Sequence, residues 1–571
     1  MTALLGRAAF HILYGDRKKK IAKFLRSTTP DSLLSDLHTC LVREGVSSIT
    51  REAVFYASSI RDSPQEQPYW TKKSFQNHLA RTHPDTTIPD TAINILWSCF
   101  CFYAYHPFPL PGATDRKLDL PAFERGLILL SLQGTRLLGT VEDDFGHCWG
   151  RINDPCSCRF RINRIFRSIS LVNCQSSSNP QVAGFDTFIT DDVIDAILPI
   201  FPFHPKLYPS LDQLTPLAEG LLEQRTNQYQ MKVNDFAALL SLIMRLRVYK
   251  PTWGRDFHYG SFEDSSLEKE ELANILARSF CHGQDKYLAP DLVLRALDIL
   301  PNLEQEFHQL WATLFQPSTS TGIPNLGIES SADTTMNGIL RAVSLFIPPF
   351  QAHKRSELLR KVKLISFQKC YDSISSQSLT DSLDLGLILQ RTFQDYPNYR
   401  SYLVLLLGHQ ARDSTKVVVG AYFPSCTQTP AAKKGKKPEE IDESRIAPPL
   451  LLFQLQPSFS LFRWNGEDSM SLSQVNDSAS VHTDHPNCIG DPTQSKVGVE
   501  IDSVTGQATF LRGTATTANR MSGMYEEVTT SRKDDGAETI NEDQQERRTT
   551  FTLTRIAIFN VEGGPNYDYT W

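Results

Sequence analysis

The segment that most constrains the fold is LLFQLQPSFSLFRW, which occupies residues 451–464. Its two apolar runs flank the short polar turn Gln456–Ser458, and this arrangement predicts an antiparallel β-hairpin. A second hairpin is predicted where Lys496–Ile501 and Ala508–Leu511 flank the dipeptide Thr-Gly. The C-terminal region is therefore expected to be rich in β-structure.

Further short runs rich in Val, Leu, Ile and Tyr extend this pattern. They lie at Ser401–Gly408, Lys416–Phe423 and Phe551–Phe559. Many short strands joined by polar turns indicate two packed sheets, a β-sandwich. Helices are predicted at Ser356–Ser373 and Leu379–Gln394, where we expect them to cover the flank of the sandwich.

Residues 31–315 are predicted to be mostly helix and loop, and one weak repeat recurs among them. In each copy an apolar residue is followed, five positions later, by another apolar residue that opens a helix. The pairs are Ile49 and Val54, Trp70 and Phe75, Leu118 and Phe123, Met231 and Phe236, and Tyr287 and Leu292. The same offset separates loop position 8 of an EF-hand, which forms a short β-bridge, from the helix that follows.

The calcium ligands of an EF-hand are missing from these segments. Loop position 12 should be a bidentate Glu. The residues at that position are Ala53, Ser74, Ala122, Asp235 and Asp291. Two interpretations stay open: a degenerate EF-hand-like scaffold without bound ion, or ordinary helix entry after an apolar residue.

With 571 residues, the chain is expected to fold as two or three domains. A stretch rich in Ser, Thr, Gly and Pro at residues 316–333 is the best candidate for a linker. The expected parts, in chain order, are a basic amphipathic helix at 1–30, a helical scaffold at 31–315, the linker, and a β-rich domain at 334–571 with polar inserts at 427–445 and 513–550. Both inserts are expected to be long loops between strands.

Composition excludes several classes of protein. A formal net charge of −6 gives no general attraction to nucleic acid or to an anionic membrane. The 11 cysteines are scattered from Cys40 to Cys488, unlike a secreted disulfide framework, so we expect free thiols in a reducing, cytoplasmic compartment. The strongest apolar stretch, Ala92–Tyr105, is shorter than the roughly 18 residues of a membrane span and predicts a buried helix.

Leu4–Leu25 is predicted to be one helix whose later turns are strongly basic. The basic residues are Arg17, Lys18, Lys19, Lys20 and Lys23, with Arg26 just beyond the helix. Such a helix can lie on an acidic membrane surface, which makes these side chains candidates for membrane contact. The alternative, which we favour, is a helix packed on the body of the protein with a solvated basic side.

Motifs that carry chemistry are absent from the sequence: there is no GxGxxG, GxxxxGK[ST], HExxH or GxSxG. The acidic run Glu142–Asp144 and the basic run Lys433–Lys437 are interpreted as solvated, as charge runs usually are. We therefore predict no catalytic residue and no cofactor.

Two groups of Cys, His and Asp residues have spacings that could hold zinc. One consists of His147, Cys148, Cys156, Cys158 and Cys174, and the other of His482, Asp484, His485 and Cys488. The first has no CxxC pair, and the second has no other half to close a tetrahedron. Unrelated loop residues are the favoured interpretation of both groups, and no metal is predicted.

The order of elements in the C-terminal half resembles the TLDc family. The matching segments are LGLILQRTF, SYLVLLLG, GAYF at Gly420–Phe423, LLFQLQPSFSLFRWNG at Leu451–Gly466, KVGVEIDSVTGQATFLRG at Lys496–Gly513 and TLTRIAIFNVEG at Thr552–Gly563. The resemblance implies structural roles for Gly420, Tyr422, Pro457, Trp464, Gly498 and Gly506. The family's glycine cluster is reduced here to the last two of these, and the long polar insert 513–550 replaces a family segment of small residues.

A helical, EF-hand-like half before a TLDc domain resembles the fungal restriction-of-telomere-capping proteins. This resemblance implies a non-enzymatic interaction protein that regulates assembly of the vacuolar proton-pumping ATPase, or acts in a stress- or telomere-capping-related process. It implies protein partners, a cytoplasmic location with peripheral contact at the vacuolar membrane, and neither nucleic acid nor a small-molecule substrate. The competing hypothesis is an oxidation-protective protein with a reactive thiol, which requires an exposed Cys of depressed pKa.

Overall fold

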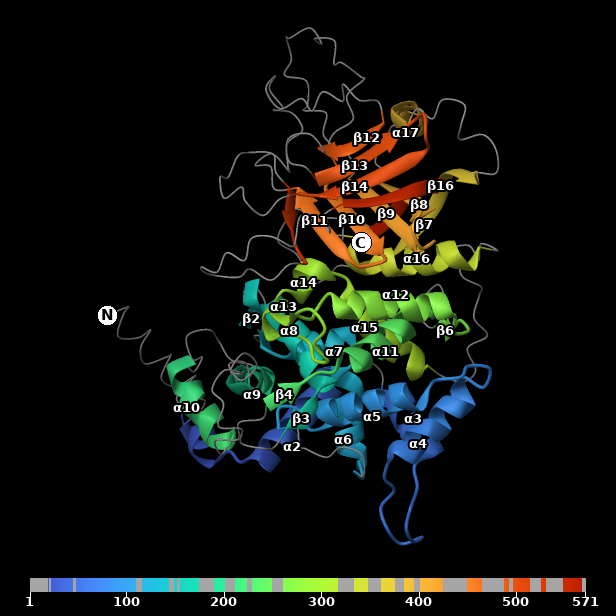
Figure 1. Cartoon of the computed structure of the whole chain (residues 1–571). Helices are drawn as coiled ribbons and strands as arrows, with labels where there is room; N and C mark the ends of the chain where they lie inside the picture. The colour runs from blue at the N-terminus through green and yellow to red at the C-terminus, as the bar shows by residue number, and fades with distance from the viewer. Residues whose placement is uncertain are drawn as a thin grey trace, which may run out of the picture. The chain divides into compact units, whose positions relative to one another are not determined.

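The computed structural model describes most of the chain (Figure 1). The residues outside the description are 1–18, 20–21, 45–47, 109–115, 143–147, 151–154, 174–188, 201–210, 223–227, 249–259, 317–332, 348–360, 375–384, 395–400, 425–448, 465–486, 492–496, 514–524, 530–547 and 567–571. The protein is a mixed α+β protein with a large antiparallel sheet, which confirms the α+β class expected from a helical half followed by a β-rich half.

The chain forms two compact units. The first comprises Met1–Ser265, Gln284–Leu297 and Leu303–Asn325, and the second comprises Ser266–Gly283, Asp298–Asn302 and Leu326–Trp571. The last division, between Asn325 and Leu326, falls within the expected linker 316–333. The segment Ser266–Gly283, however, belongs to the second unit, although the sequence order places it within the expected scaffold 31–315. The physical reason is that its helix packs on a later helix and a strand of that unit.

The first unit is mostly helical, and its described part also contains three two-stranded ribbons. The helices are α2 (Pro30–Glu44), α3 (Ser48–Ser58), α4 (Lys72–Thr82), α5 (Asp90–Ala104), α6 (Leu120–Leu129), α7 (Leu132–Leu137), α8 (Pro155–Ser168), α9 (Ile189–Ile197), the 3₁₀ turn η5 (Leu198–Ile200), α10 (Leu211–Leu222), α11 (Val233–Met244), α13 (Pro290–Leu294) and α15 (Leu303–Leu314). The ribbons pair β1 (Thr140–Glu142) with β2 (Cys148–Gly150), β3 (Leu171–Asn173) with β4 (Gln228–Gln230), and β5 (Leu246–Val248) with β6 (Gly260–Phe262). A short helix, α14 (Ala296–Ile299), lies where the chain passes into the second unit.

Helix α5 occupies the centre of the first unit. Nearly every residue from Ala92 to Ala104 is buried, and the ring of Phe100 lies 5.4 Å from that of Phe123 on α6. The prediction of a buried helix at Ala92–Tyr105 is confirmed. Among the described residues, no helix combines the length and apolar character needed to span a membrane.

Two isolated β-bridges lie immediately before helices of the first unit. Trp70 and Leu118 exchange both backbone hydrogen bonds at 2.8 Å, and α4 and α6 begin just after them. Lys232 bridges Tyr287 ahead of α11 and α13. Ile49 departs from the predicted repeat, because it lies inside α3 instead of preceding a helix.

The described residues of the second unit form three helices and one antiparallel sheet. The helices are α12 (Leu267–Arg278), α16 (Thr334–Phe346) and α17 (Leu385–Gln394), and the strands are β7 (Lys361–Ile374), β8 (Ser401–His409), β9 (Lys416–Phe423), β10 (Leu451–Gln456), β11 (Ser460–Trp464), β12 (Cys488–Asp491), β13 (Val497–Asp502), β14 (Gln507–Arg512), β15 (Tyr525–Glu527) and β16 (Arg548–Asn566). The strand order is β12-β13-β14-β16-β8-β9-β10-β11-β15, and β7 also pairs with β16 (Figure 1).

Strand β16 holds the sheet together. It pairs β8 along one edge, and on the other edge it pairs first with β14 and then with β7. The sheet folds over, because Phe462 of β11 and Phe510 of β14 contact each other at 5.9 Å although four strands separate them in the sheet order. The expected two separate sheets are therefore one continuous hydrogen-bonded sheet among the described strands, with a common apolar core.

Several local expectations are confirmed, and two are wrong. Both predicted hairpins form, as β10–β11 and β13–β14. The segment Ser356–Ser373 was expected to be helical, but Lys361 onward is strand β7, since its backbone pairs along its length with β16. The insert 513–550 contains strand β15, which adds to β11. The insert 427–445 lies outside the described residues, as do residues 379–384 of the predicted helix that ends in α17.

Candidate functional site

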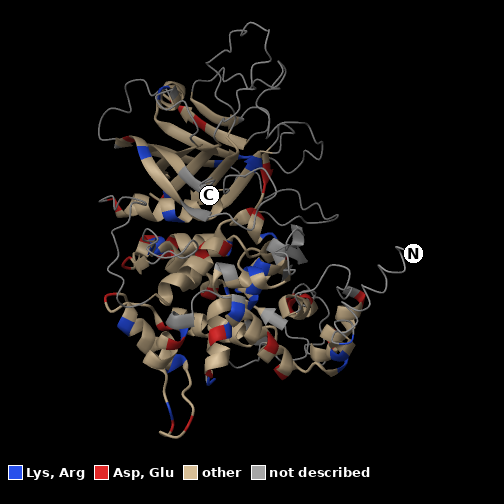
Figure 2. Cartoon of the chain, turned by 180° about the vertical axis from the view of Figure 1, so that it is seen from behind, with Lys and Arg blue, Asp and Glu red and all other residues tan. Residues whose placement is uncertain are grey.

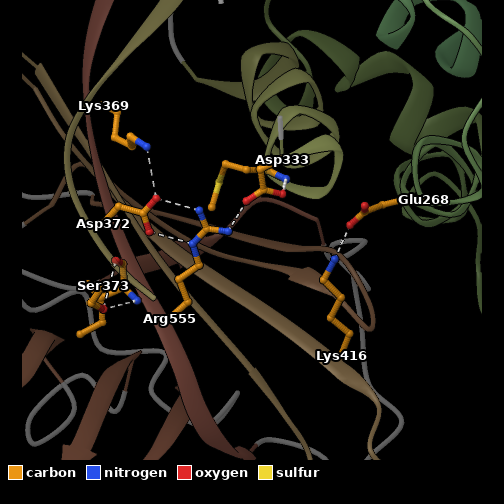
Figure 3. A network of polar contacts seen from close by, with 9 residues as sticks. Glu268, Asp333, Lys369, Asp372, Ser373, Lys416 and Arg555 are labelled. Carbon is orange, nitrogen blue, oxygen red and sulfur yellow. Dashed lines mark hydrogen bonds and ion pairs between the residues drawn. The ribbon is translucent and has the colours of Figure 1, made fainter. Parts of the chain in front are cut away.

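A network of charged side chains joins α16 to the sheet of the second unit (Figure 3). Arg555 of β16 donates from Nε and Nη2 to the two carboxylate oxygens of Asp372 on β7, at 2.8 Å each. Its third nitrogen, Nη1, pairs with Asp333, whose other oxygen accepts a hydrogen bond from Met336 N at 3.0 Å and caps α16. One guanidinium thus binds two strands and a helix N-terminus together.

The electrostatics of this network fix its charge state. Hydrogen bonds from Arg555 lower the pKa of Asp372. Burial raises the pKa of Asp333, but hydrogen bonds from Arg555 and from backbone N–H groups of α16, together with the charge of Arg555, outweigh it and the net shift is downward. The pKa of Arg555 is raised, first of all by its hydrogen bond to Asp372. Both carboxylates are therefore ionised at neutral pH, whereas a general acid–base catalyst needs a pKa near the working pH.

A second ion pair joins α12 to the same sheet. Lys416 of β9 pairs with Glu268 of α12, and both side chains are partly exposed (Figure 3). Beside it, Phe346 at the end of α16 packs its ring 4.8 Å from that of Phe453 on β10. These contacts hold two helices against the strands of the sheet. Every charged group named here already has a partner of opposite sign, so we interpret the contacts as structural.

The first unit has a separate charged centre that is fully buried. Arg164 on α8 donates to Asp192 and Asp195 of α9, at 3.1 Å each, and it is 1% exposed. Burial alone would raise the pKa of Asp192, but Arg167 and Arg164 lower it further than burial raises it. A buried ion pair is costly to break, because either partner left alone is an unsolvated charge. We interpret this centre as fixing α8 on α9.

The residues implicated by the TLDc resemblance lie on β9, the two hairpins and β13. Gly420 on β9 faces Phe453, and a Cβ built on it would lie 2.3 Å from the ring. Tyr422 is buried, which raises its pKa to about 12. Pro457 lies in the exposed turn between β10 and β11. Trp464 ends β11 and packs edge-on against Tyr525 at 5.0 Å.

The remaining two glycines occupy backbone positions. Gly498 on β13 pairs with Gly490 on β12. Gly506 closes the β13–β14 turn at φ +67°, a conformation that side chains with a Cβ rarely adopt. These two glycines shape the sheet. The six residues to which the TLDc resemblance assigns structural roles do not come together in one site.

The zinc hypotheses fall largely outside the described residues. His147, Cys174, His482, Asp484 and His485 lie there, and of Cys148, Cys156 and Cys158 only the backbone is described, in β2 and α8. Cys488 begins β12, where burial raises its pKa to about 11. Within the described part of the chain, no three His, Cys, Asp or Glu residues are grouped so that they could hold a metal ion.

The thiols whose pKa is perturbed are unsuited to reducing peroxide. Burial raises the pKa of Cys101 to about 12 and raises that of Cys99 as well. Both lie on α5 and are buried. Because the thiolate is the nucleophile, a raised pKa makes a cysteine less reactive at neutral pH.

The basic N-terminal residues are described only in part. Residues 22–27 are helical, and Lys19, Lys23 and Arg26 are exposed, while Arg17, Lys18 and Lys20 lie outside the described residues together with the lysines at 433–437. On the described elements of both units, Lys and Arg are interspersed with Asp and Glu (Figure 2). The exposed basic residues near the N-terminus therefore remain candidates for surface contact.

No protein-family model matches this sequence, and no curated protein is significantly similar to it.

The Arg555 network was not predicted from the sequence. One signal was present: Arg555 is the only charged residue between Phe551 and Val561, in a strand whose other side chains there are apolar or small and polar. Its partners Asp372 and Asp333 lie too far away in the sequence for any local pattern to connect them.

Proposed function

We propose that this chain is a non-enzymatic interaction protein whose second unit is a TLDc domain, and that it regulates the assembly of the vacuolar proton-pumping ATPase. A stress- or telomere-capping-related process is the broader setting of the same proposal. The observation that supports it is the antiparallel sheet built around the β10–β11 hairpin, in the order of segments on which the TLDc resemblance rests.

The chemistry of the described side chains agrees with an adaptor. The carboxylates around Arg555 are held ionised by hydrogen bonds, and the described thiols of raised pKa are buried or half-buried. The ion pairs stabilise the fold of the second unit, and thiols of raised pKa are poor nucleophiles at neutral pH. An adaptor needs a rigid surface for a protein partner, which a clamped sheet supplies.

We further propose that the first unit is a degenerate EF-hand-like scaffold without calcium. The bridge between Trp70 and Leu118 has the reciprocal hydrogen bonds of paired loops, and the next residue in each, Thr71 and Asp119, caps the following helix. At position 12, Ser74 uses its hydroxyl in the capping box of α4, and Ala122 offers no ligand. The two loops are therefore closed by protein contacts in place of an ion.

The test uses the full chain with an affinity tag, expressed in fungal cells and captured under mild conditions. We expect subunits of the proton-pumping ATPase among the retained proteins, and a change in the membrane-assembled fraction of the pump when purified protein is added to vacuolar membranes. Phe551→Ala, which removes a buried side chain of β16, should abolish both effects, while the neighbouring exposed change Thr550→Ser should not. Retention of no pump subunit, together with an unchanged assembled fraction, would refute the proposal.

Peripheral contact at the vacuolar membrane is part of this proposal. The exposed residues Lys19, Lys23 and Arg26 support it. Binding of the full chain to vesicles containing anionic lipid should fall as salt is raised, because exposed charges are screened over about 10 Å at 0.1 M salt. Substitution of these three residues by Ala should weaken that binding, and equal binding by the substituted protein would exclude a role for them.

A further inference from the structure

Two histidines cap the C-terminal end of α15 in the first unit. His78 on α4 contacts Leu314 O through Nε2 at 2.9 Å, and His83, just after α4, contacts Thr313 O through Nε2 at 3.1 Å. The last carbonyls of a helix lack the usual partner within the helix, and the two histidines supply donors there, alongside a hydrogen bond from Gln316 N to Thr313 O at 3.3 Å. A carbonyl oxygen can only accept a hydrogen bond, so Nε2 carries the hydrogen in each ring.

The other ring nitrogen of His78 faces a positive charge. Its Nδ1 lies 3.3 Å from Nη2 of Arg81, whose Nη1 donates to Ala57 O at 2.6 Å. Because a guanidinium can only donate, Nδ1 of His78 must be the acceptor. A second proton on this ring would have to be placed on Nδ1, where it would remove that hydrogen bond and oppose the charge of Arg81.

Apart from the contact with Leu314 O, which raises the pKa of His78, the surroundings of the ring disfavour a second proton. The ring is 1% exposed and lies between aromatic groups, 5.1 Å from the ring of Phe315 and 5.7 Å from that of Trp70. The charged or titratable neighbours that act on it are Arg81 and His83, and both disfavour the protonated form. Burial is the largest cause, and the pKa of His78 is lowered to about 4.

The same helix is held by a third buried histidine. His308 on α15 contacts Leu130 O through Nδ1 at 2.7 Å. Burial lowers its pKa to about 4, although Glu304 on the same helix acts in the opposite direction. Arg136 on α7 and Arg161 on α8 add to the lowering. For His83 the pKa is also lowered, by burial, against the effect of its contacts with Thr313 O and Leu314 O.

We propose that the junction between α4 and α15 is acid-sensitive: the closed junction holds His78 buried and neutral beside Arg81, so an opening that exposes the ring to water and lets it take up a proton becomes more favourable as the pH falls. Such a junction would make the first unit respond to acidification of its surroundings. The inference stands on the geometry of the first unit alone and goes beyond the proposed function, so it does not depend on the identity of any partner.

The direction with pH follows from linkage. The folded-state pKa of His78, about 4, lies below the ordinary value of 6.5. Above pH 6.5 neither state is protonated and the contacts have their full value. Between pH 6.5 and 4 the opened state takes up a proton that the closed state refuses, so opening becomes more favourable as pH falls. For one such histidine the opening equilibrium should rise about tenfold between pH 7.5 and 5.5.

Hydrogen–deuterium exchange on the full chain tests the inference. Amides of α4 and α15, corrected for the intrinsic effect of pH on exchange, should open about tenfold more often at pH 5.5 than at pH 7.5. Amides of β8 and β9 in the second unit provide the internal reference and should change little. Equal protection of α4 and α15 at the two pH values would overturn the inference.

Substitutions separate His78 from the other histidines. His78→Gln keeps an N–H donor for Leu314 O and an acceptor for Arg81, but it does not titrate, so the acid response of α4 should shrink about tenfold. Arg81→Gln removes the opposing charge from an exposed position and should also weaken the response. His409→Gln, on an exposed histidine of β8, should leave it unchanged. If His78→Gln does not fold at pH 7.5, Arg81→Gln decides: an acid response of unchanged size in that variant counts against the inference.

Discussion

Gly420 shows how closely the two strands β9 and β10 approach the helix that packs on them. Its missing side chain leaves room for the ring of Phe453, which in turn packs against Phe346 of α16. The ring is fully buried and held from both sides, so it has no space to retreat. A methyl group at Gly420 therefore has to displace either the ring or the strand.

We expect Gly420→Ala to lower the free energy of unfolding of the second unit by about 1–3 kcal/mol, the usual cost of overpacking a core. Urea denaturation followed by exchange of the β9 and β10 amides measures it. The matched control is Gly220→Ala on α10, where a Cβ meets nothing within 4 Å. Alanine is the better helix former, so this change should be neutral or slightly stabilising. Equal effects of the two substitutions would contradict the packing argument.

Arg555 is the residue on which three elements converge. Substitution by Met keeps the length of the side chain but leaves Asp333 and Asp372 as unpaired carboxylates, so the free energy of unfolding should fall by about 1–3 kcal/mol. A double-mutant cycle with Asp372→Asn is the control. The double variant should lose less than the sum of the two single losses, because the second change removes the charge that the first leaves unpaired.

The same pair predicts how this contribution depends on pH. The pKa of Asp372 lies below its ordinary value of 3.8 in the folded protein, owing first to the hydrogen bond from Arg555. Its stabilising effect is present above about pH 3.8 and is lost as the pH falls through the lower folded-state value. The difference in stability between the wild type and Arg555→Met should hence be constant near neutral pH and shrink below about pH 3.8. A difference that persisted in stronger acid would show that Arg555 acts by packing alone.

At the scale of the element, β16 offers a test of its alternating faces. Phe551 is 1% exposed, whereas Thr550 beside it is exposed and contacts Thr509 through its hydroxyl at 3.2 Å. Phe551→Ala should destabilise the second unit by about 3–5 kcal/mol, and Thr550→Ser should stay within about 0.5 kcal/mol of the wild type. Thermal unfolding monitored by circular dichroism compares them. If Thr550→Ser cost as much as Phe551→Ala, the observed register of β16 would be wrong.

Elements defined by neighbouring residues could be predicted from the sequence, and elements defined by distant partners could not. The β13–β14 turn is local, since Asp502 accepts hydrogen bonds from Val504 N and Thr505 N within three residues. Strand β7 was predicted to be helical because its pairing with β16 is invisible in its own pattern. Strand β15 is too short, at Tyr525–Glu527, to stand out within a polar insert.

At the scale of the whole molecule, the two units should respond to acid in sequence. The described buried histidines, His78, His83, His106 and His308, belong to the first unit, and burial lowers the pKa of each below 6.5. Their contributions fade as the pH falls from about 6.5, whereas those of the carboxylates paired with Arg555 last until below about 3.8.

An acid titration followed by hydrogen exchange should consequently show protection lost from α4, α5 and α15 before it is lost from β8 and β16. The ordering is the prediction, and it is independent of the absolute stability of either unit. Simultaneous loss of protection in both units, or earlier loss in the sheet, would show that the buried histidines do not govern the acid response of the first unit.

The sequence predicted the boundary between the two units better than it predicted which segments belong to each unit. A linker at 316–333 is visible in composition, and the final division of the units falls there. The transfer of Ser266–Gly283 to the second unit has no such signal, because α12 is an ordinary amphipathic helix whose partners, α16 and β10, lie far along the chain. The Arg555 network was missed for the same physical reason, a separation of 183 residues between its two strands.

The pairing of β16 also has a consequence for biosynthesis. Among the described strands it is the last to leave the ribosome, yet β14, β7 and β8 all take it as a neighbour. Each of those strands therefore keeps an unpaired edge until β16, which ends at Asn566, has been translated and can pair with it. During that interval the nascent sheet is in three pieces, β12–β13–β14, β8–β9–β10–β11–β15 and β7 alone, and the strand edges that β16 will cover stay open to pairing with other chains.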